Sequence, residues 1–346
     1  MADKLGYGLL GCGTVAPWHI NGILETPEAE LVAVCDTDPE KARQRQEESG
    51  AARLYTDHRE MLEDPDIKAV SVCVPSGLHT RLGMDIIRAG KHILVEKPLD
   101  ITLPKIDAFI KAAREMDVKL GCIFQRRTTP VWQAVKHAID SGVIGRLLVA
   151  DAYLKYHRNQ EYYDSAPWRG TWAMDGGGAL MNQGIHIVDI LQWVIGPPRN
   201  VFARCDHLIR NIEVEDTAAA VITWRCGAIG VIEGTTSIYK GIDHRIEFHG
   251  EKGNILIEGD GIALWENADE VPCPEGLSGG ASGTASDPTS ISFEGHRIQI
   301  EDFTKAVLED RSPMIGGEEA RKAIELIVGI YRSSELGQPV EFPLAE

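Results

Sequence analysis

The sequence contains little positive charge. Its 346 residues include 35 Lys and Arg against 52 Asp and Glu, which gives a formal net charge of −17. Nucleic acids and anionic membrane surfaces are bound through clustered cations, so this deficit argues against both classes of partner. It does not argue against a small anionic ligand that two or three local arginines could hold.

Long apolar runs and paired cysteines are lacking as well. No segment approaches the roughly 18 apolar residues of a membrane span, and residues 1–13 contain neither a basic leader nor a cleavage site. None of the seven cysteines forms a C-x-x-C pair, and Cys35, Cys73 and Cys122 lie in apolar runs, as small buried hydrophobes do. Outside the segment 175–196, no pair of histidines or carboxylates shows a metal-ligand spacing. We therefore expect a cytoplasmic protein without disulfides and without a bound metal.

What the sequence does contain falls into two regions, as its length and 43% hydrophobic content predict. In the first 125 residues, short apolar runs alternate with amphipathic stretches. The runs are LGYGLL, LVAVC, AVSVCV, HILV and KLGCIF. Alternating strands and helices predict βαβ units around a doubly wound parallel sheet that is buried on both faces.

The order of predicted elements changes after about residue 147. Strand-like runs follow one another, mostly without helices between them, which predicts an antiparallel sheet. Helical patterns come near 297–310 and 317–334, and the Gly/Ser-rich stretch 275–290 is typical of a mobile loop. We therefore expect an α/β domain over 1–125 and an α+β domain over 126–346, with room for a C-terminal helix to pack back on the first domain.

A glycine-rich turn ends the first apolar run. The motif Gly11-Cys12-Gly13-Thr14-Val15-Ala16 is a G-x-G-x-x-A, and a helical pattern follows it. The first glycine permits a tight turn, the second lets the backbone approach a pyrophosphate, and the small alanine lets helix and strand pack closely. The N-terminus of the helix then faces the phosphates. This order of elements favours a dinucleotide site over a glycine turn that binds nothing.

Asp36 indicates which dinucleotide is bound. It ends the second apolar run, twenty-three residues after Gly13. A carboxylate at this place accepts hydrogen bonds from both hydroxyls of an adenine ribose and repels a 2′-phosphate. We therefore predict NAD rather than NADP, although Arg43 or Arg45 could still reach a phosphate.

Lys97 is the first candidate for chemistry. It directly follows the fifth apolar run, within Glu96-Lys97-Pro98. Ligands of doubly wound sheets bind beyond the carboxyl ends of the strands, so a lysine there could hydrogen-bond a substrate hydroxyl or take part in its proton transfer. Taken alone, a lysine at a strand end is more typical of a surface cation.

His186 is the second candidate. It lies in DGGGALMNQGIHIVDILQWVIG, residues 175–196, where three successive glycines at 176–178 indicate that backbone comes close to something. Asn182 and His186 are four residues apart and share a face if the segment is helical, with Asp189 three further on. Histidine titrates near neutrality, which makes His186 the natural base for an alcohol proton. A helix-capping or core histidine is the alternative.

Taken in order, these motifs resemble the Gfo/Idh/MocA oxidoreductases. The matching features are the G-x-G-x-x-A at 11–16, Asp36, Pro75-Ser76-x-x-His79, Glu96-Lys97-Pro98 and the glycine-rich segment through His186. They span essentially the whole chain. The resemblance implies an N-terminal Rossmann domain, a C-terminal α+β domain with a large open, mostly antiparallel sheet, and homodimers or homotetramers formed through that sheet. It also implies oxidation or reduction of a sugar, sugar acid or cyclitol carbon with NAD(P).

The resemblance assigns roles to individual residues. The catalytic residues would be Lys97, His186 and Asn182. The residues that would bind the cofactor are Gly11, Cys12, Gly13, Thr14, Val15, Asp36, Pro75, Ser76, His79, Glu96, Lys97, Gln125, Trp168 and Arg169.

Position 182 departs from the family pattern. Many relatives carry Asp where this chain has Asn182, so that a Lys/Asp/His trio forms. Asn182 can orient a hydroxyl, but it cannot stabilise a protonated imidazole by charge; Asp189 could supply that charge or could be a buried structural residue. The stretch MNQ at 181–183 and IEVEDT at 212–217 are most similar to members that oxidise position 3 of UDP-N-acetylglucosaminuronate and of related glycosides.

A third cluster mixes aromatic residues with arginines. It runs YHRNQEYY over 156–163 and WRGTW over 168–172, with Arg126 and Arg127 upstream. Aromatic faces stack on the C–H faces of a pyranose, and arginines can hold a carboxylate or phosphate through two hydrogen bonds. An interface between domains or subunits is the alternative use of these side chains. The expected substrate-binding residues are Lys97, Arg127, Tyr156, Arg158, Tyr163, Arg169, Asn182 and His186.

The sequence thus predicts an NAD-dependent dehydrogenase that oxidises a secondary alcohol of a pyranose. Hydride would pass to nicotinamide C4 while His186 takes the hydroxyl proton and Lys97 holds the oxygen. An inositol-type cyclitol dehydrogenase shares every motif, and a ketone reductase uses the same groups in reverse. Two further alternatives are an NAD-binding regulator without turnover and an enzyme that keeps and recycles its cofactor. Both would carry the same motifs, and only activity and cofactor release would distinguish them from the dehydrogenase.

Overall fold

The computed structural model describes residues 4–279 and 293–344, which form two compact units. Among these described residues, the first unit takes in 4–125 and 293–321, and the second takes in 126–279 and 322–344. The greater part of the predicted loop 275–290 lies outside the described residues.

The first unit is built on a six-stranded sheet in which every neighbouring pair is parallel, as the alternating pattern predicts. The strand order is β3-β2-β1-β4-β5-β6. The strands are β1 (Leu5–Leu10), β2 (Ala29–Cys35), β3 (Arg53–Tyr55), β4 (Ala69–Val72), β5 (His92–Val95) and β6 (Leu120–Cys122). The order reverses between β1 and β4, and sheets of this topology bind ligands beyond the carboxyl ends of the strands at that point.

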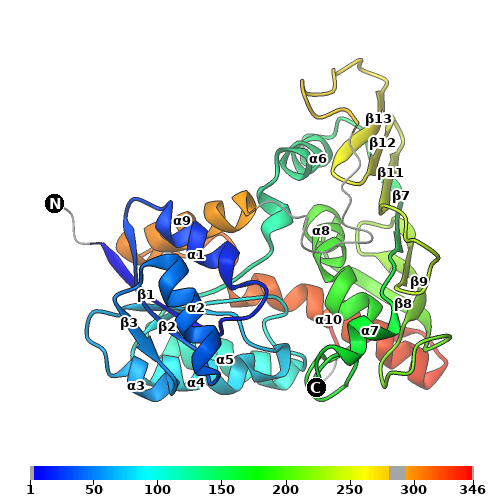
Figure 1. Ribbon diagram of the computed structural model, residues 1–346. Coiled ribbons are helices and arrows are strands. Elements are labelled where there is room, and N and C mark those ends of the chain that lie inside the picture. The colour runs from blue at the N-terminus through cyan, green and yellow to red at the C-terminus, as the bar shows by residue number, and fades with distance from the viewer. Residues whose placement is uncertain (1–3, 280–292, 345–346) are drawn as a thin grey trace. The chain divides into compact units, whose positions relative to one another are not determined.

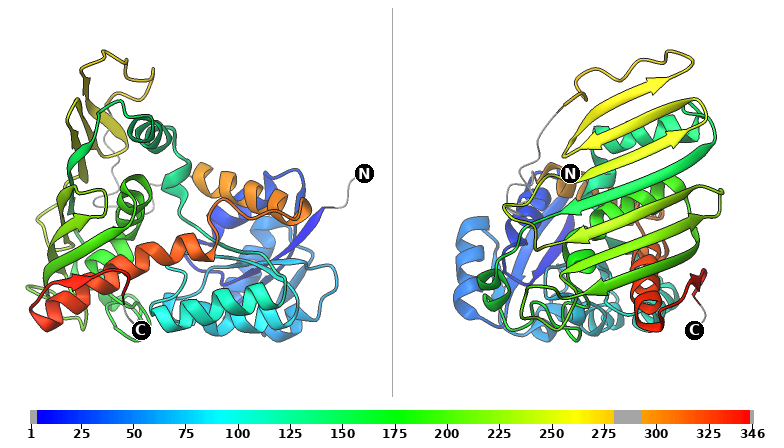
Figure 2. Two further views of the ribbon diagram at one scale, coloured as in Figure 1. Left: turned by 180° about the vertical axis from the view of Figure 1, so that it is seen from behind. Right: turned by 90° about the vertical axis from the view of Figure 1, so that its right-hand side faces the viewer.

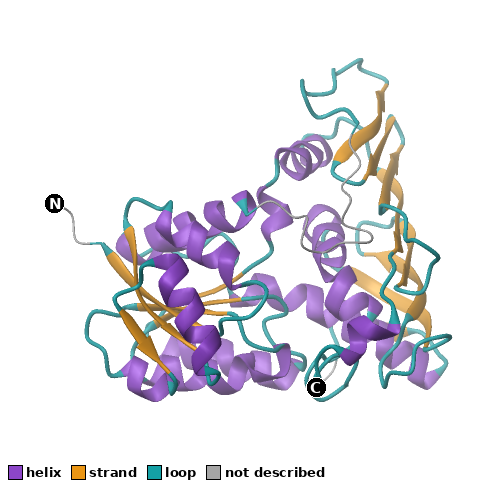
Figure 3. Cartoon of the chain, in the orientation of Figure 1, coloured by secondary structure: helices purple, strands orange, loops and turns teal. Residues whose placement is uncertain are grey.

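Helices cover both faces of this sheet, with α1, α2 and α9 on one face and α4 and α5 on the other (Figure 1, Figure 3). Their ends follow local signals. Asp38 caps α2 by accepting from the N–H groups of Glu40 and Lys41, and Gly50 ends the helix in the left-handed conformation. The helical elements before the second unit are α1 (Ala16–Leu24), α2 (Pro39–Ser49), α3 (His58–Leu62), the short η1 (Ser76–Leu78), α4 (His79–Arg88) and α5 (Leu103–Glu115).

Helix α9 (Glu294–Leu308) returns from the far end of the chain and packs against α1. In the core, the Tyr7 hydroxyl lies 2.8 Å from Thr304 Oγ1. Gln299 accepts a hydrogen bond from the Phe124 N–H at 2.8 Å and donates one to the Cys122 carbonyl at 3.3 Å. Helix α9 thus packs back on the first domain, as the sequence analysis allowed, and its partners Tyr7, Cys122 and Phe124 all belong to the first unit.

The second unit contains an eight-stranded sheet in the order β13-β12-β11-β7-β10-β9-β8-β14 (Figure 2). Its pairs are antiparallel except for β7 with β10, which confirms the mostly antiparallel sheet that the resemblance implies. The strands are β7 (Leu147–Lys155), β8 (Pro198–Asp206), β9 (Thr217–Trp224), β10 (Ile229–Thr235), β11 (Arg245–Gly250), β12 (Gly253–Glu258), β13 (Gly261–Asn267) and β14 (Val340–Glu341).

Helices lie along one face of this sheet, and within residues 4–279 and 293–344 no helix covers the other, open face (Figure 2, Figure 3). The open face carries exposed apolar side chains, with Phe202 and Val221 each 50% exposed. Besides α9, the helical elements that follow β6 are η2 (Gln125–Thr128), α6 (Pro130–Asp140), α7 (Gln160–Asp164), the π-helical η3 (Ala179–Gly184), α8 (Ile185–Ile195) and α10 (Gly317–Leu336). No helix in the described parts of the chain is long and apolar enough to cross a membrane.

Replacing Gln299 by Met tests the attachment of α9. The change keeps the length of the side chain but leaves the buried Phe124 N–H without its acceptor, so we expect the free energy of unfolding to fall by about 1–3 kcal/mol. Urea unfolding measures it. Gln44→Met is the control, because Gln44 hydrogen-bonds Glu48 on the exposed surface of α2 and its loss should change stability by less than about 0.5 kcal/mol. Equal effects of the two substitutions would contradict the assignment.

Candidate active site

The turn after β1 is shaped by two glycines with different surroundings. Gly11 has a φ of 97°, and a Cβ on it would lie 2.5 Å from the Cys73 carbonyl oxygen, so only glycine fits there. Gly13 and Thr14 are exposed, and a Cβ on Gly13 would meet no atom within 4 Å. The space over Gly13 is therefore open to a ligand.

The N-terminus of α1 opens beside this turn. Val15 stands at the N-cap position and supplies no side-chain hydrogen bond to the first backbone N–H groups of the helix. The Ala16 and Trp18 N–H groups donate to the Gly13 and Val15 carbonyls at 3.3 and 3.1 Å, and Pro17 has no N–H. The start of α1 therefore offers a phosphate the positive end of the helix dipole. Together with the open Gly13, this arrangement fits the pyrophosphate of a dinucleotide.

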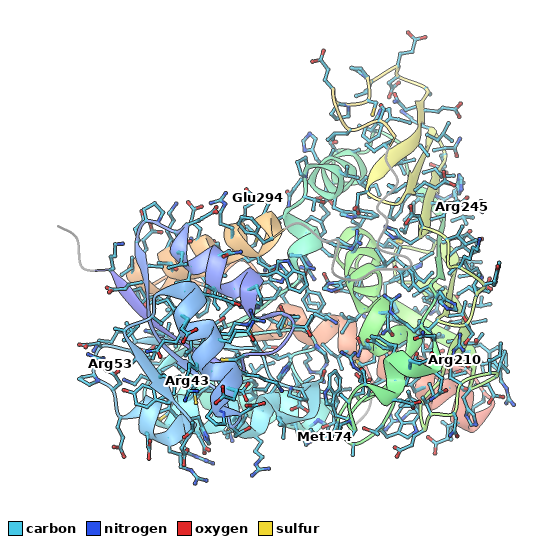
Figure 4. The ribbon with its side chains drawn as sticks, viewed as in Figure 1. Arg43, Arg53, Met174, Arg210, Arg245 and Glu294 are labelled. Carbon is cyan, nitrogen blue, oxygen red and sulfur yellow. The ribbon has the colours of Figure 1, made fainter. Side chains whose placement is uncertain are left out.

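Asp36 is fixed at the end of β2. Its Oδ2 accepts from the Cys12 N–H at 2.7 Å, and its Oδ1 accepts from the Asp38 N–H at 2.9 Å. Each carboxylate oxygen can accept more than one hydrogen bond, so both can still receive ribose hydroxyls. Arg43 lies exposed on α2, paired with Glu40 (Figure 4), and Arg45 reaches the Gly13 carbonyl at 3.5 Å. The negative charge held over the turn favours a ribose without a 2′-phosphate.

Glu96, before Lys97, is a buried carboxylate at the end of β5. Its Oε1 lies 2.9 Å from His19 Nε2 and 3.2 Å from His296 Nε2, and its Oε2 accepts from the Lys97 N–H at 3.1 Å. Burial alone would raise the pKa of Glu96, but the bonds from the two histidines outweigh it and hold the pKa well below its ordinary value. The carboxylate therefore stays ionised and fixes the backbone that carries Lys97.

His19, Glu96 and His296 could also hold a metal ion, because their donor atoms lie within 4.8 Å of one another. No spacing in the sequence indicates this set, since its members are far apart in the chain. We interpret it as a hydrogen-bonded carboxylate. Both short distances are hydrogen-bond lengths, and Ser71 Oγ at 2.6 Å from His19 Nδ1 leaves the Nε2–H of that ring for Glu96.

His79 was expected to flank the cofactor, but its ring is buried between two backbone carbonyls. Nδ1 lies 2.6 Å from the Pro98 oxygen and Nε2 lies 2.9 Å from the Val74 oxygen. Burial lowers the pKa of His79, and the carbonyls oppose that shift. The imidazole thus ties the loop after β4 to the Glu96-Lys97-Pro98 turn, and any part that it has in cofactor binding passes through the backbone.

In the second unit, Asn182 and His186 lie on the side of a helix that is not fully buried. The segment is π-helical over η3 and continues as α8. Asn182, Gln183 and His186 are half-buried, whereas the other residues from Ala179 to Val188 are buried. The two predicted catalytic side chains thus share the accessible face, as their spacing predicts.

Contacts within the second unit explain why glycines precede this helix. A Cβ on Gly177 would lie 2.2 Å from the Tyr331 hydroxyl, and one on Gly178 would lie 1.9 Å from the Glu215 carbonyl oxygen. The Glu215 carboxylate accepts from the N–H groups of Gly178 and Leu180 and from the Tyr331 hydroxyl, each at 2.8 Å. Burial raises the pKa of Glu215 to about 7, against these hydrogen bonds. The close approach that the glycines indicate is therefore to Glu215 and Tyr331.

Asp175 lies beside Asn182. Its Oδ1 accepts from Asn182 Nδ2 at 2.6 Å, and its Oδ2 accepts from the Gly170 N–H at 2.9 Å. The residue is 2% exposed, and it directly follows Met174, which Figure 4 labels. No spacing in the sequence pairs Asp175 with Asn182, because six residues, three of them glycines, separate the two.

A cluster of aromatic rings and guanidinium groups lies in the same unit. The Arg169 guanidinium carbon stands 4.3 Å from the centre of the Tyr162 ring and 4.7 Å from that of Trp168. The Arg158 guanidinium carbon is 5.6 Å from the Tyr162 ring, and the Tyr162 hydroxyl accepts from Gln183 Nε2 at 3.1 Å. Tyr162 and Gln183 thus connect the arginines to the helix of Asn182. Tyr162 belongs to the predicted aromatic cluster, but neither residue is among the expected substrate-binding residues.

Two of the predicted substrate-binding residues are buried against other side chains of the protein. Tyr163 is buried, and its hydroxyl lies 2.8 Å from Thr236 Oγ1, so its neighbour Tyr162 is the accessible tyrosine. Arg127 is 3% exposed and bonds both oxygens of Asp189, through Nε at 2.7 Å and NH2 at 2.6 Å. Arg127 is therefore committed to a buried ion pair. Of the two roles considered for Asp189, the structure supports the structural one.

The other predicted residues have mixed surroundings. Tyr156 and Arg158 are buried, and Arg158 donates through NH1 to the His157 carbonyl at 2.6 Å. Gln125 is buried at the start of η2, whereas Pro75 and Ser76 are half-buried. Their roles stay predictions.

Comparison with known proteins agrees with this geometry. The family described as "Oxidoreductase family, NAD-binding Rossmann fold" matches residues 5–124, and the Gfo/Idh/MocA C-terminal domain matches residues 132–256. The chain belongs to the Gfo/Idh/MocA oxidoreductase family. The resemblance seen in the motifs is thereby confirmed, and the first unit is an NAD-binding Rossmann domain, as predicted.

Several proteins to which this chain is similar are named for sugar or cyclitol substrates. The crystal structure of the WlbA dehydrogenase from Bordetella pertussis, in complex with NADH and UDP-GlcNAcA, is 34% identical with a TM-score of 0.90, over 99% of this chain and 100% of that one. Myo-inositol 2-dehydrogenase of Thermotoga maritima is 30% identical over 72% of this chain and 74% of its own length. The 1,5-anhydro-D-fructose reductase of Ensifer adhaerens is 26% identical over 97% and 98%.

Replacing Arg127 by Met tests the buried ion pair. The change leaves the Asp189 carboxylate buried without its partner, so we expect a loss of about 3–5 kcal/mol in the free energy of unfolding. The double variant Arg127→Met/Asp189→Leu should regain most of that loss, because no charge is left buried. Arg126→Met is the control, since its partner Asp260 is half exposed and the pair is worth about 1 kcal/mol or less. If the Arg127→Met protein had normal stability and weakened substrate binding, Arg127 would be a substrate-binding residue, as the sequence predicts.

Proposed function

We propose that this family member is an NAD-dependent dehydrogenase that oxidises a secondary alcohol of a pyranose bearing an anionic group. The observation that carries the proposal is the second unit's helix with Asn182 and His186 on its accessible face, joined through Gln183 and Tyr162 to Arg169. An acid–base group, a hydroxyl-orienting amide, an aromatic ring and a guanidinium are what an anionic sugar needs.

The chain's own residues have separate tasks in this reaction. NAD, when bound, accepts the hydride from the carbinol carbon. His186 takes the hydroxyl proton, and Lys97 holds the oxygen from which that proton leaves. Asn182 orients the same hydroxyl by a hydrogen bond. The Gly11–Val15 turn and Asp36 hold the cofactor, and Glu96 keeps the Lys97 backbone in place.

Arg169 favours an acidic sugar. Arg169 lies on the Tyr162 ring, and a guanidinium at this place suits a carboxylate or phosphate of the substrate better than a neutral polyol. The WlbA dehydrogenase, the relative described with UDP-GlcNAcA, is similar over the whole chain. We therefore propose a sugar-nucleotide uronate as the substrate and carbon 3 as the position oxidised.

A cyclitol dehydrogenase is the second candidate, favoured by the 30% identity to myo-inositol 2-dehydrogenase. The same residues could also serve a ketone reductase, since a proton transfer between His186 and an oxygen runs in both directions. A panel followed by absorbance of reduced nicotinamide separates these candidates. It should hold UDP-N-acetylglucosaminuronate, methyl glucosides and myo-inositol, each with NAD and with NADP, and ketone acceptors with NADH.

The open face of the second sheet supports a homo-oligomer. Phe202, Val221 and Ile229 are all half exposed or more on that unit, and apolar side chains gathered on one face are typical of a subunit interface. We propose a homodimer or homotetramer through this sheet, and a cytoplasmic location that suits seven free cysteines.

The catalytic assignment is tested with Lys97→Met and His186→Ala. Each should lower kcat by roughly 10²–10⁴-fold, because a proton-transfer or oxygen-holding group is lost, while NAD affinity and the unfolding midpoint stay the same. Lys105→Met and His207→Ala are the controls, since both side chains are about half exposed in ion pairs with Asp100 and Asp206. Near-normal turnover in both test variants would remove the two residues from the mechanism.

The cofactor assignment is tested with Asp36→Asn, which keeps the shape of the side chain, removes its charge and replaces one of its two acceptor oxygens by an NH2 group. A hydrogen bond to a charged group is worth about 1.4 kcal/mol more than a neutral one, so we expect about tenfold weaker NAD binding and improved use of NADP. Titration calorimetry and kcat/KM with both cofactors measure the change. Arg43→Gln, on the exposed side of α2, should leave the preference unaltered. An unchanged preference in Asp36→Asn would show that another group excludes NADP.

A further inference from the structure

We propose that Asp175 is a positioning residue of the catalytic segment, which orients the Asn182 amide and places a fixed negative charge behind it. The proposal deepens the proposed function, on which it rests for the reaction that Asn182 serves. Its structural half concerns only contacts within the second unit.

Asp175 has the surroundings of a carboxylate held in one position. It is 2% exposed, and its two oxygens accept from two different segments, Asn182 Nδ2 at 2.6 Å and the Gly170 N–H at 2.9 Å. Its own N–H donates to the Thr171 carbonyl at 3.0 Å. Both the backbone and the side chain of Asp175 are therefore fixed, which a buried carboxylate needs if it is to hold another group.

The carboxylate decides which way the Asn182 amide faces. An ionised carboxylate only accepts hydrogen bonds, so Asn182 has to turn its NH2 group toward Asp175. The carbonyl oxygen of the same planar amide then faces the opposite way, as an acceptor for a hydroxyl. With a neutral amide at position 175, both orientations of Asn182 become possible, and one of them would present a donor to that hydroxyl.

The charge of Asp175 also bears on His186. Asn182 and His186 follow each other on the accessible side of the same helix, and the carboxylate stands one hydrogen bond behind Asn182. His186 becomes positively charged when it takes the substrate proton, and a negative charge on the Asp175 carboxylate would lower the free energy of that state. Asp189 cannot serve in this way, because its charge is neutralised by Arg127 in the core.

The Asp175 carboxylate also links the segment of Arg169 to the segment of Asn182 and His186. Its Oδ2 holds the Gly170 N–H directly after Trp168-Arg169, and its Oδ1 holds Asn182. A shift of either segment would break one of these bonds. Asp175 therefore sets the spacing between the group that would bind the substrate anion and the amide that would orient its hydroxyl.

The test exchanges the carboxylate and the amide between positions 175 and 182. Asp175→Asn should lower kcat roughly 10- to 100-fold, as losing a group that orients a catalytic residue commonly does, with the KM for NAD unchanged. Asn182→Asp places two carboxylates in contact and should lower both kcat and stability. In Asp175→Asn/Asn182→Asp the carboxylate–amide pair is restored in reverse, so kcat should return to within a few-fold of the parent value.

Asp164→Asn is the matched control. Asp164 also accepts from a side-chain amide, that of Gln160 at 3.0 Å, but this pair is exposed at the end of α7. Its loss should change neither kcat nor the unfolding midpoint. A merely structural role for Asp175 would lower the midpoint and kcat together and would leave kcat low in any double variant of normal stability.

A second readout needs no turnover. The side-chain amide resonances of Asn182, assigned by their absence in Asn182→Ala, should shift in Asp175→Asn and stay in place in Asp164→Asn. If the parent protein oxidises nothing in the panel, the proposed function fails while these resonances still decide whether Asp175 holds Asn182. Unshifted resonances, an unchanged kcat in Asp175→Asn, or a double variant that folds but does not recover kcat would each overturn the proposal.

Discussion

Buried negative charge is the constraint on which both units depend. A carboxylate removed from water needs donors at its oxygens, or its burial is strongly unfavourable. Glu96 finds them in two histidines and the Lys97 backbone, Asp189 in Arg127, and Glu215 in the start of η3 and in Tyr331. Asp175 finds them in Gly170 and Asn182. Three of these four carboxylates thus fix a segment that carries a candidate functional residue.

The glycines of the two units illustrate different uses of the same residue. Gly11 is required because the backbone after β4 comes within contact distance, and Gly177 and Gly178 are required by Tyr331 and Glu215. Of these four glycines, only Gly13 has open space around it. The protein's own packing requires a missing side chain at the other three, whereas no protein atom requires it at Gly13, where the space is open to a ligand.

Much of the fold and of the cofactor site could be predicted from local pattern. The strands of the parallel sheet, the turn at 11–16 and Asp36 are encoded by contiguous residues or by fixed spacings. The helix that presents Asn182 and His186 on one face is encoded in the same way. Partners contributed by distant segments could not be predicted in this way. His19 and His296 meet Glu96 across most of the chain length, and no periodicity in the sequence relates them.

Side-chain choice within a cluster was the least predictable part. Tyr162 and Tyr163 are adjacent, and only the packing of Tyr163 against Thr236 shows that Tyr162 is the accessible one. Arg127 carries the same guanidinium as Arg169, yet it is buried with Asp189. A guanidinium or a phenol is suited to both a ligand and a core partner, so residue type alone cannot separate the two uses.

The sequence by itself determined the family, the cofactor class, the two kinds of sheet and the positions of Lys97, Asn182 and His186. These follow from hydrophobic period, from glycine spacing and from residues that stand at strand ends, all of which are local properties. The tertiary structure decided that α9 belongs with the first sheet, that Asp189 is a core residue and that Asp175 is the carboxylate beside Asn182. The physical reason is that burial and hydrogen-bond partnership depend on which segments the fold brings together, and that information appears only when the chain is packed.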